Sequence, residues 1–386
     1  MKILTRPSAV ATLLIVVMTL MAFSNPVKKN QNLNTAPAPK IQVAILLDVS
    51  NSMDGLIDQA RGQLWNMVST MGKAKCDNAI PQIEIALYEY GRSTNDKAIG
   101  YVKQISPFTS DLDNLSKNLF GLTTNGGDEF CGHVIYTSMK ELNWDPSPSS
   151  YKVIFIAGNE DFLQGDIHYT LACEEAHKKG VIVNTIYCGD KAQGISEHWN
   201  LGSECGGGSF TNINQDSKIE EIPTPYDSTI FALNDKLNGT YISYGYSGAG
   251  SLARQSEVDQ LNIKMSKTVA LERAAVKGIS KLYDNTTWDL VDADSKDEKF
   301  LDKLDPKTLP DSLRNKKTKE IRKVVKEKSL QRSVIQQKIT EISNKRENYI
   351  AAEKKKQAAI NNNATMETEV EKIIKEQARR HNMIIQ

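Results

Sequence analysis

The hydrophobic pattern of residues 41–214 alternates between buried strands and amphipathic helices. Residues 41–47 form a nearly continuous apolar run, which is typical of a strand covered on both faces in a parallel sheet. Shorter runs at 153–157 and 181–187 predict further strands. Repeated alternation of strand and helix favours right-handed crossovers, with helices on both faces of the sheet. The predicted fold class is therefore α/β, with a doubly wound and mostly parallel sheet.

The spacing of apolar residues predicts the other elements of this region. Alternating polar and apolar residues indicate a strand over 81–90, and a shorter strand over 100–105 is expected to pair with it as a hairpin through a turn at 91–97. Apolar residues three and four positions apart predict helices. These helices span residues 55–71, 111–119, 131–142 and 166–179.

From residue 224 the pattern changes to helices, which predicts an α-helical C-terminal extension. Helices are expected over 225–237 and 252–283. The Gly- and Tyr-rich segment 238–250 between them is expected to be a loop, which either packs on the α/β domain or forms a self-contained surface loop. Residues 316–386 lack Pro and Gly and are rich in charged residues, so they predict a long helix with a break near 361–364.

A heptad seam with polar interruptions runs along this long helix. Its positions alternate steps of four and three residues, as in a coiled coil. Three alternatives stay open: a coiled coil that joins two copies of the chain, a solvated single helix, or a helix hairpin folded against the middle helices. The seam consists of Ile321, Val325, Lys328, Arg332, Ile335, Ile339, Ile342, Arg346 and Tyr349.

The charge balance argues against a nucleic-acid partner. The 386 residues include 48 Lys and Arg against 47 Asp and Glu. A DNA-binding protein normally shows an excess of clustered basic residues. A chain of this length can bury one or two cores.

The N-terminus has the pattern of a secretory signal peptide. Lys2 and Arg6 precede an apolar stretch over 9–23, and Ala22-Phe-Ser24 is a small-x-small cleavage site. The stretch is short for a membrane span, so we expect no integral span in the mature chain, with an uncleaved anchor as the alternative. We expect a secreted or periplasmic bacterial protein. The predicted segments are 1–24 (signal peptide), 25–40 (disordered leader), 41–222 (α/β domain), 223–311 (helical and loop extension) and 312–386 (long charged helix).

Five cysteines are compatible with disulfide formation after export: Cys76, Cys131, Cys173, Cys188 and Cys205. The odd number leaves at least one unpaired in a monomer, and the spacings include no Cys-x-x-Cys pair of the kind that binds zinc. The preferred pair is Cys188, at the end of a predicted strand, with Cys205, before a glycine turn. The alternative is that most of them are small buried apolar residues.

Oxygen-bearing side chains follow the first strand on alternate residues: Asp48, Ser50 and Ser52. Ligand crevices of open α/β sheets lie at the carboxyl ends of the strands, which is where Asp48 stands. One carboxylate and two hydroxyls match the ligands of Mg²⁺, with Mn²⁺ or Ca²⁺ as alternatives. In isolation, the same residues could simply cap the helix that follows.

Residues 41–53 resemble the first metal-site segment of the von Willebrand factor A (VWA) domain family. The similarity continues through the segments 151–157, 180–189 and 201–211, to about Asn214, and so covers roughly half of the mature chain. The resemblance implies a doubly wound α/β domain that binds partners through a metal-ion-dependent adhesion site (MIDAS).

The third loop of the family supplies another metal ligand, usually a Thr after two glycines. Here Asp128 follows Gly126-Gly127 and takes that place, with Thr123 and Thr124 as alternates. Glycines at these positions allow the backbone to approach an ion closely.

The fourth segment departs from the family pattern. The family commonly ends its central strand with Thr-Asp-Gly, and Gly158 stands here in place of the Asp. Glu160 or Asp161 could reach in, Asn159 could bond through water, or Asp128 could supply the missing charge. The implied metal ligands are Asp48, Ser50, Ser52, Asp128 and Glu160.

These features favour a binding protein over an enzyme. The resemblance implies a protein partner that offers an acidic residue to the metal. The sequence has no nucleophile or phosphate-loop motif, and its five histidines lack metal-type spacing. Two alternatives remain: an envelope structural protein that self-associates through its helical tail, and a metal-assisted hydrolase that uses Asp48, Asp128 and Glu160.

Overall fold

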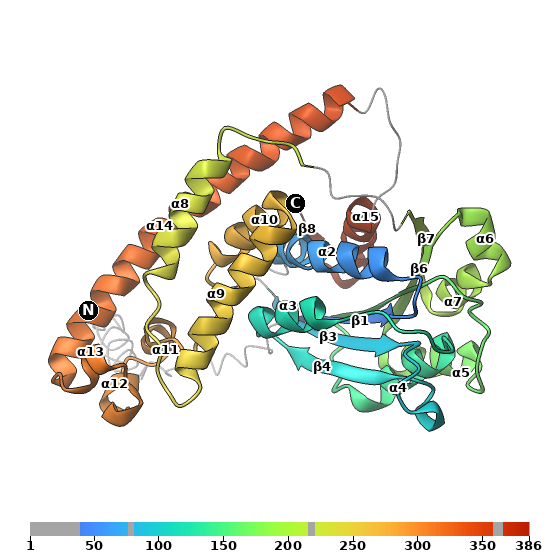
Figure 1. The fold of residues 1–386 in the computed structure, drawn as a ribbon, viewed down its shortest axis with the longest axis horizontal. Coiled ribbons are helices and arrows are strands. Elements are labelled where there is room, and N and C mark those ends of the chain that lie inside the picture. Colours follow the sequence, from blue (N-terminus) through green and yellow to red (C-terminus); the bar gives the residue numbers. More distant parts are fainter. Residues whose placement is uncertain (1–38, 76–80, 215–220, 358–365, 386) are drawn as a thin grey trace, which may run out of the picture. The chain divides into compact units, whose positions relative to one another are not determined.

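The structure is a computed structural model that describes residues 39–75, 81–214, 221–357 and 366–385 (Figure 1). The predicted signal peptide, nearly all of the predicted leader, Cys76 and the predicted break at 361–364 lie outside these ranges. The chain from Ala38 onward forms one compact unit. Within the described ranges, no helix has both the length and the apolar character that crossing a membrane requires.

A six-stranded sheet forms the centre of the α/β domain, in the order β4-β3-β1-β5-β6-β7. Every neighbouring pair is parallel except β3 with β4, which is the predicted hairpin. The doubly wound α/β prediction is therefore confirmed. The strands are β1 (Lys40–Asp48), β3 (Gln82–Tyr90), β4 (Lys103–Thr109), β5 (Tyr151–Gly158), β6 (Ile182–Cys188) and β7 (Gly207–Ile213).

Strand β4 begins three residues later than predicted. The helical turn η1 (Lys97–Ile99) precedes it, and Gly100 ends that turn in the left-handed conformation with φ 70°. Tyr101 is left-handed as well, with φ 56°, so the chain becomes extended only after Tyr101, because left-handed residues interrupt a strand.

Helices cover both faces of the sheet, and alternate residues of β1 face the two layers. Val43 and Leu47 belong to one core cluster, and Ala44 and Leu46 to the other. The first layer contains α2 (Asp54–Gly72), α3 (Leu112–Gly121) and α15 (Met366–Ala378). The second contains α4 (Cys131–Glu141), α5 (Tyr169–Lys179) and α7 (Trp199–Cys205), with the short α6 (Lys191–Ser196) before α7.

The C-terminal helix α15 completes the first layer beside α2 (Figure 1). Its apolar residues Val370, Ile373 and Ile374 are buried in the same cluster as β1. Gln377 exchanges hydrogen bonds with Asn184 on β6, at 2.7 and 3.1 Å. Two short strands, β2 (Ala74–Lys75) and β8 (Ile384–Ile385), then pair antiparallel. The end of the predicted charged tail is thus part of the α/β core.

The extension between β7 and α15 is helical, as predicted. The expected single helix over 252–283 is wrong, since Ser266 has an extended backbone with φ −161° and its side chain caps the next helix at Thr268 N. The helices are α8 (Asp227–Asn238), α9 (Gly248–Met265), α10 (Lys267–Lys277), α11 (Leu290–Lys296), α12 (Phe300–Lys303), α13 (Asp311–Arg314) and α14 (Thr318–Gln357).

The heptad seam of α14 faces the middle helices of the same chain, mainly α8, α10 and α11. Ile321, Val325 and Ile339 are buried there. The polar interruptions are explained by partners: Arg332 pairs with Asp289 at 2.6 Å. Folding against the middle helices is therefore correct for α14, and its seam is occupied within the chain. The expected hairpin is wrong, because α15 packs on the sheet instead.

A buried ionic network joins the extension to the α/β domain. Arg273 on α10 donates to Asp113 on α3 at 2.6 Å and to Asp259 on α9 at 2.5 Å. Lys277 donates to the same Asp259 at 3.0 Å, and the Arg273 guanidinium lies 4.6 Å from the ring of Trp65 on α2. Together, Asp113, Asp259, Arg273 and Lys277 form what we call the Arg273 network.

The disulfide joins Cys173 to Cys205, so the preferred Cys188–Cys205 pair is wrong. Cys188 ends β6 with its side chain in the α2 layer. Helices α5 and α7, which carry Cys173 and Cys205, pack together in the opposite layer. Strand alternation thus separates Cys188 from Cys205 by the thickness of the sheet. Cys188 and Cys131 are free and buried.

Candidate metal centre

Three loops meet at the carboxyl edge of the sheet. Asp48 is the last residue of β1, and the parallel neighbour β5 ends at Gly158. The third loop is held against β1 because Asn125 N donates to Val49 O at 2.8 Å. Parallel pairing of β1 and β5 therefore brings residues about 110 positions apart to one edge, as the sequence predicted for Asp48.

Asp48 is fully buried, which is unusual for a carboxylate. Its Oδ1 accepts a hydrogen bond from Ser50 N at 2.7 Å, and its Oδ2 has no partner. Burial raises the pKa of Asp48 to about 6, and the negative charge of Glu160 adds to the shift, whereas the Ser50 N–H and weaker contacts from the Ser50 hydroxyl and the Asn159 backbone lower it. A buried carboxylate with one unpaired oxygen is an incomplete arrangement that a cation would complete.

Two further buried oxygens at this edge also lack partners among the described residues: Ser50 Oγ and Asn159 Oδ1. With Asp48 Oδ2 they form a set that we call the edge oxygens. Buried polar atoms in folded proteins nearly always have a partner, so three unpaired oxygens at one edge require an explanation. Carboxylate, hydroxyl and amide oxygens are the ligands that hard divalent cations take. The residues present therefore fit a bound cation.

Ser52, Glu160 and Asp128 are exposed around the edge oxygens. Asn159 Nδ2 donates to Ser52 Oγ at 3.3 Å, which places Ser52 next to the fourth segment. Negative charge from Glu160 reaches Asp48. The structure thus brings Asp48, Ser50, Ser52 and Glu160 to one edge, with the first two buried and the others at its rim. Within the described ranges, no group of three or more His, Cys, Asp or Glu side chains is arranged to hold a metal by itself.

Tyr90 explains why Gly158 stands where the family has an Asp. A Cβ atom added at Gly158 would lie 2.6 Å from the Tyr90 hydroxyl and 3.1 Å from Asp48 Oδ2. The Tyr90 hydroxyl occupies this space and donates to Ala157 O at 3.0 Å. An Asp at 158 would therefore displace Tyr90, and the neighbouring Asn159 oxygen takes up a position at the edge instead.

Glu129 is a residue that the sequence analysis missed. A Cβ atom at Gly91 would lie 2.9 Å from Asp48 Oδ1 and 3.0 Å from Glu129 Cγ, so these two side chains meet over Gly91. Glu129 is buried whereas its neighbour Asp128 is exposed. The pKa of Glu129 is raised to about 8, mainly by burial and further by the negative charges of Asp48, Glu160 and Asp128. In the sequence, the adjacent acids Asp128 and Glu129 indicate that a carboxylate could lie here, but they do not show which of the two turns inward.

The remaining third-loop residues hold the loop in place. A Cβ atom at Gly127 would lie 2.5 Å from Gly91 O, so only glycine allows this close approach. Thr124 Oγ1 donates to Asp54 at 2.8 Å, and Thr123 contacts Arg92. The two alternate threonines thus have other partners in the structure.

Comparisons with solved structures found weak similarities to several proteins. BatB from Bacteroides thetaiotaomicron is 15% identical, with 45% of this chain and 90% of that chain covered and a TM-score of 0.34. The SpRpn10 VWA domain is also 15% identical, with 45% and 88% covered and a TM-score of 0.34. Proximal thread matrix protein 1 from the mussel byssus, with a zinc-occupied MIDAS motif, is 14% identical, with 47% and 43% covered and a TM-score of 0.34.

The α/β domain has the VWA type of fold. The strand order and the two helix layers of the chain itself support this fold, since similarities at such TM-scores are too weak to do so. Fold alone does not identify ligands or partners. No family model and no curated protein matches the sequence.

Proposed function

We propose that this protein is an exported binding module whose VWA-type domain engages a protein partner through a divalent cation. The observation that carries the proposal is the set of edge oxygens, which are buried, unpaired and on neighbouring loops. Asp48, Ser50 and Asn159 would hold the ion, with Glu129 beside Asp48.

The other predicted ligands belong to the same proposal. Ser52, Asp128 and Glu160 are exposed, so they are available to the ion through water or to the partner directly. We favour Mg²⁺ because the donors are all oxygens, with Mn²⁺ or Ca²⁺ as alternatives. A bound ion would supply the positive charge that attracts an acidic residue of the partner.

Export is proposed from the N-terminal pattern and is supported by the Cys173–Cys205 disulfide. Disulfides persist in the periplasm and outside the cell, and are rare in the cytosol. We propose a non-catalytic role, since the edge oxygens are suited to hold a cation and the sequence offers no nucleophile motif.

Calorimetric titration with MgCl₂ and MnCl₂ tests the cation site. Asp48→Asn keeps the side-chain shape and removes the charge, so metal binding is expected to weaken at least tenfold. Asp58→Asn is the matched control, because Asp58 is an exposed carboxylate on α2 that pairs only with Arg61 among the described residues. Equal metal binding by wild type and Asp48→Asn would contradict the proposal.

The partner is tested on the same variants. Capture of envelope proteins by the full chain should require a divalent ion and should be lost in EDTA and in Asp48→Asn. Capture that persists under both conditions would show that partner binding does not depend on the metal, which would contradict this part of the proposal.

A further inference from the structure

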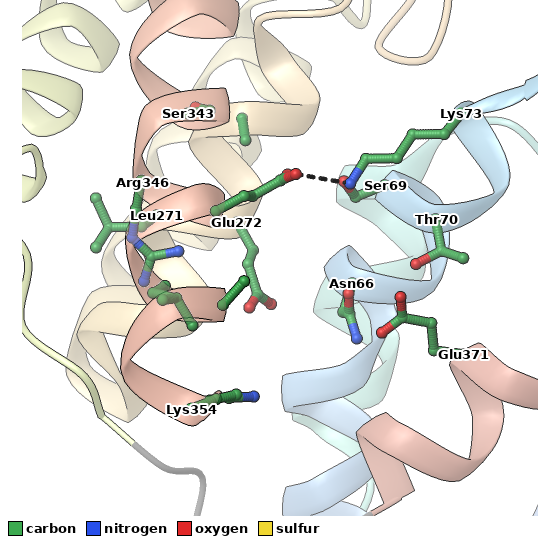
Figure 2. Close-up of a pocket in the computed structure, with 14 residues that line it drawn as sticks. Asn66, Ser69, Thr70, Lys73, Leu271, Glu272, Ser343, Arg346, Lys354 and Glu371 are labelled. Carbon is green, nitrogen blue, oxygen red and sulfur yellow. Dashed lines mark hydrogen bonds and ion pairs between the residues drawn. The ribbon is translucent and has the colours of Figure 1, made fainter. Parts of the chain in front are cut away.

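A cavity of about 250 Å³ lies between the α/β domain and the helical extension (Figure 2). Its walls come from α2, α10, α14 and α15, so residues far apart in the sequence meet there. None of the residues proposed for the metal centre lines it. The cavity is therefore a separate candidate site.

The cavity is lined by charges of both signs in equal number. A ligand with only negative charge would face three acids, and one with only positive charge would face three bases. A ligand that carries both charges matches the lining best. The cations are Lys73, Arg346 and Lys354, and the acids are Glu272, Glu347 and Glu371.

Two neighbouring groups on α14 are suited to the anionic end of a ligand. Arg346 is buried, and its Nε donates to Asp227 at 3.2 Å, while its two terminal nitrogens make no hydrogen bond to any described residue. Ser343, one turn earlier, lines the cavity with a buried hydroxyl that has no partner in the described residues. A planar guanidinium and a hydroxyl are good donors to a carboxylate, which would also satisfy the hydroxyl.

The opposite wall is suited to a cationic end. Asn66 on α2 and Glu371 on α15 point toward each other across from Arg346 (Figure 2). Glu371 lies 2.7 Å from Lys375 of its own helix, and both members of that pair are partly exposed. Exposed ion pairs of this kind are weak, so the carboxylate can accept a second cation. The ion pair between Lys73 and Glu347, at 2.9 Å, links α2 to α14 beside the cavity.

We propose that this cavity binds a small zwitterion of the amino-acid type, with its carboxylate on Arg346 and Ser343 and its ammonium group toward Glu371. The volume is sufficient for a small molecule of this class, since one water occupies about 30 Å³ of liquid. The ligand would bridge the α/β domain and the extension.

Calorimetric titration of the full chain with each of the twenty common L-amino acids tests the proposal. Succinate and 1,4-diaminobutane serve as probes that carry charge of one sign only. At least one amino acid is expected to bind at least tenfold more tightly than either probe. Absence of binding by every amino acid, or equal binding by a single-sign probe, would overturn the proposal.

Ser343→Ala distinguishes a ligand-binding hydroxyl from a structural one. Because the hydroxyl has no partner in the fold, its removal should leave the melting temperature unchanged or raise it, while amino-acid affinity falls about tenfold. Ser329→Ala, at an exposed position of the same helix, should change neither quantity. A lower melting temperature with unchanged affinity in Ser343→Ala would refute the assigned role.

Discussion

The two charged clusters of this chain are built in opposite ways. In the Arg273 network, each of the four charged side chains has an oppositely charged partner within about 3 Å. At the edge of the sheet, Asp48 has an unpaired carboxylate oxygen and acidic neighbours. Both clusters are buried, so burial alone does not separate them.

The difference between them indicates their roles. A satisfied buried network fixes the packing of helices, here α3, α9 and α10. An unsatisfied cluster costs free energy in the free protein and is retained where a ligand completes it. The Arg273 network is accordingly structural, and the edge oxygens are the proposed binding site.

The largest expected effect is that of Asp259→Ala. This change leaves Arg273 and Lys277 buried with one counterion fewer, and breaking such a network costs about 3–5 kcal/mol of unfolding free energy. Urea unfolding followed by circular dichroism measures the loss. Glu257→Ala on the same helix is the control: Glu257 is half exposed and pairs with Lys117 at the surface, so the expected cost is under about 1 kcal/mol. Equal losses of unfolding free energy in the two variants would contradict a structural role for the Arg273 network.

Ile374→Ala tests whether the C-terminal helix is part of the α/β core. Ile374 is fully buried in the cluster of β1, so the expected loss is about 2–5 kcal/mol. Lys372→Ala, at an exposed position of α15, should cost less than about 0.5 kcal/mol. A small effect of Ile374→Ala would show that α15 is dispensable for the domain.

The pH dependence of stability reports on the Arg273 network. Arg273 and Lys277 lower the pKa of Asp259 below its ordinary 3.8 despite its burial. The unfolded chain therefore binds a proton near pH 3.8 that the folded protein does not bind, and the stability present above this pH falls as pH drops. One such group contributes about 1.4 kcal/mol per pH unit. Urea titrations between pH 5 and 3 should show a steeper fall in wild type than in Asp259→Asn, and parallel curves would contradict this.

The smallest expected effect has the opposite sign. Asp48→Asn removes an incompletely paired buried charge, so the metal-free protein should be unchanged or more stable by about 1–2 kcal/mol. The increase in melting temperature that MgCl₂ gives the wild type should disappear. If Asp48→Asn instead lowered the free energy of unfolding by several kcal/mol, Asp48 would have a structural role like the charges of the Arg273 network.

Much of the fold was predictable because it follows local periodicity. The strand up to Asp48 and the helices after it were predicted from apolar spacing, and the helix expected over 111–119 corresponds to α3, of which Asp111 is the N-cap. The break at Ser266 was not predictable, since it depends on one residue becoming extended in a sequence of helical pattern. The position of α15 against the sheet follows only from contacts with residues about 200 positions away, such as Asn184 with Gln377.

The candidate site was predictable in its position but not in its details. Asp48 and Ser50 were expected at the strand end, and they lie there. The sequence could not show whether Asp128 or Glu129 turns toward Asp48, because the conformation of the loop decides which of two adjacent acidic side chains points inward. The role of Tyr90 in excluding a side chain at 158 depends on packing between two strands.

The most direct test of the central claim is an anomalous difference map from crystals soaked in MnCl₂. We expect a manganese peak within coordination distance of all three edge oxygens. A map without a peak there, in which the side chains of Asp48, Ser50 and Asn159 instead share ordered water, would contradict the account.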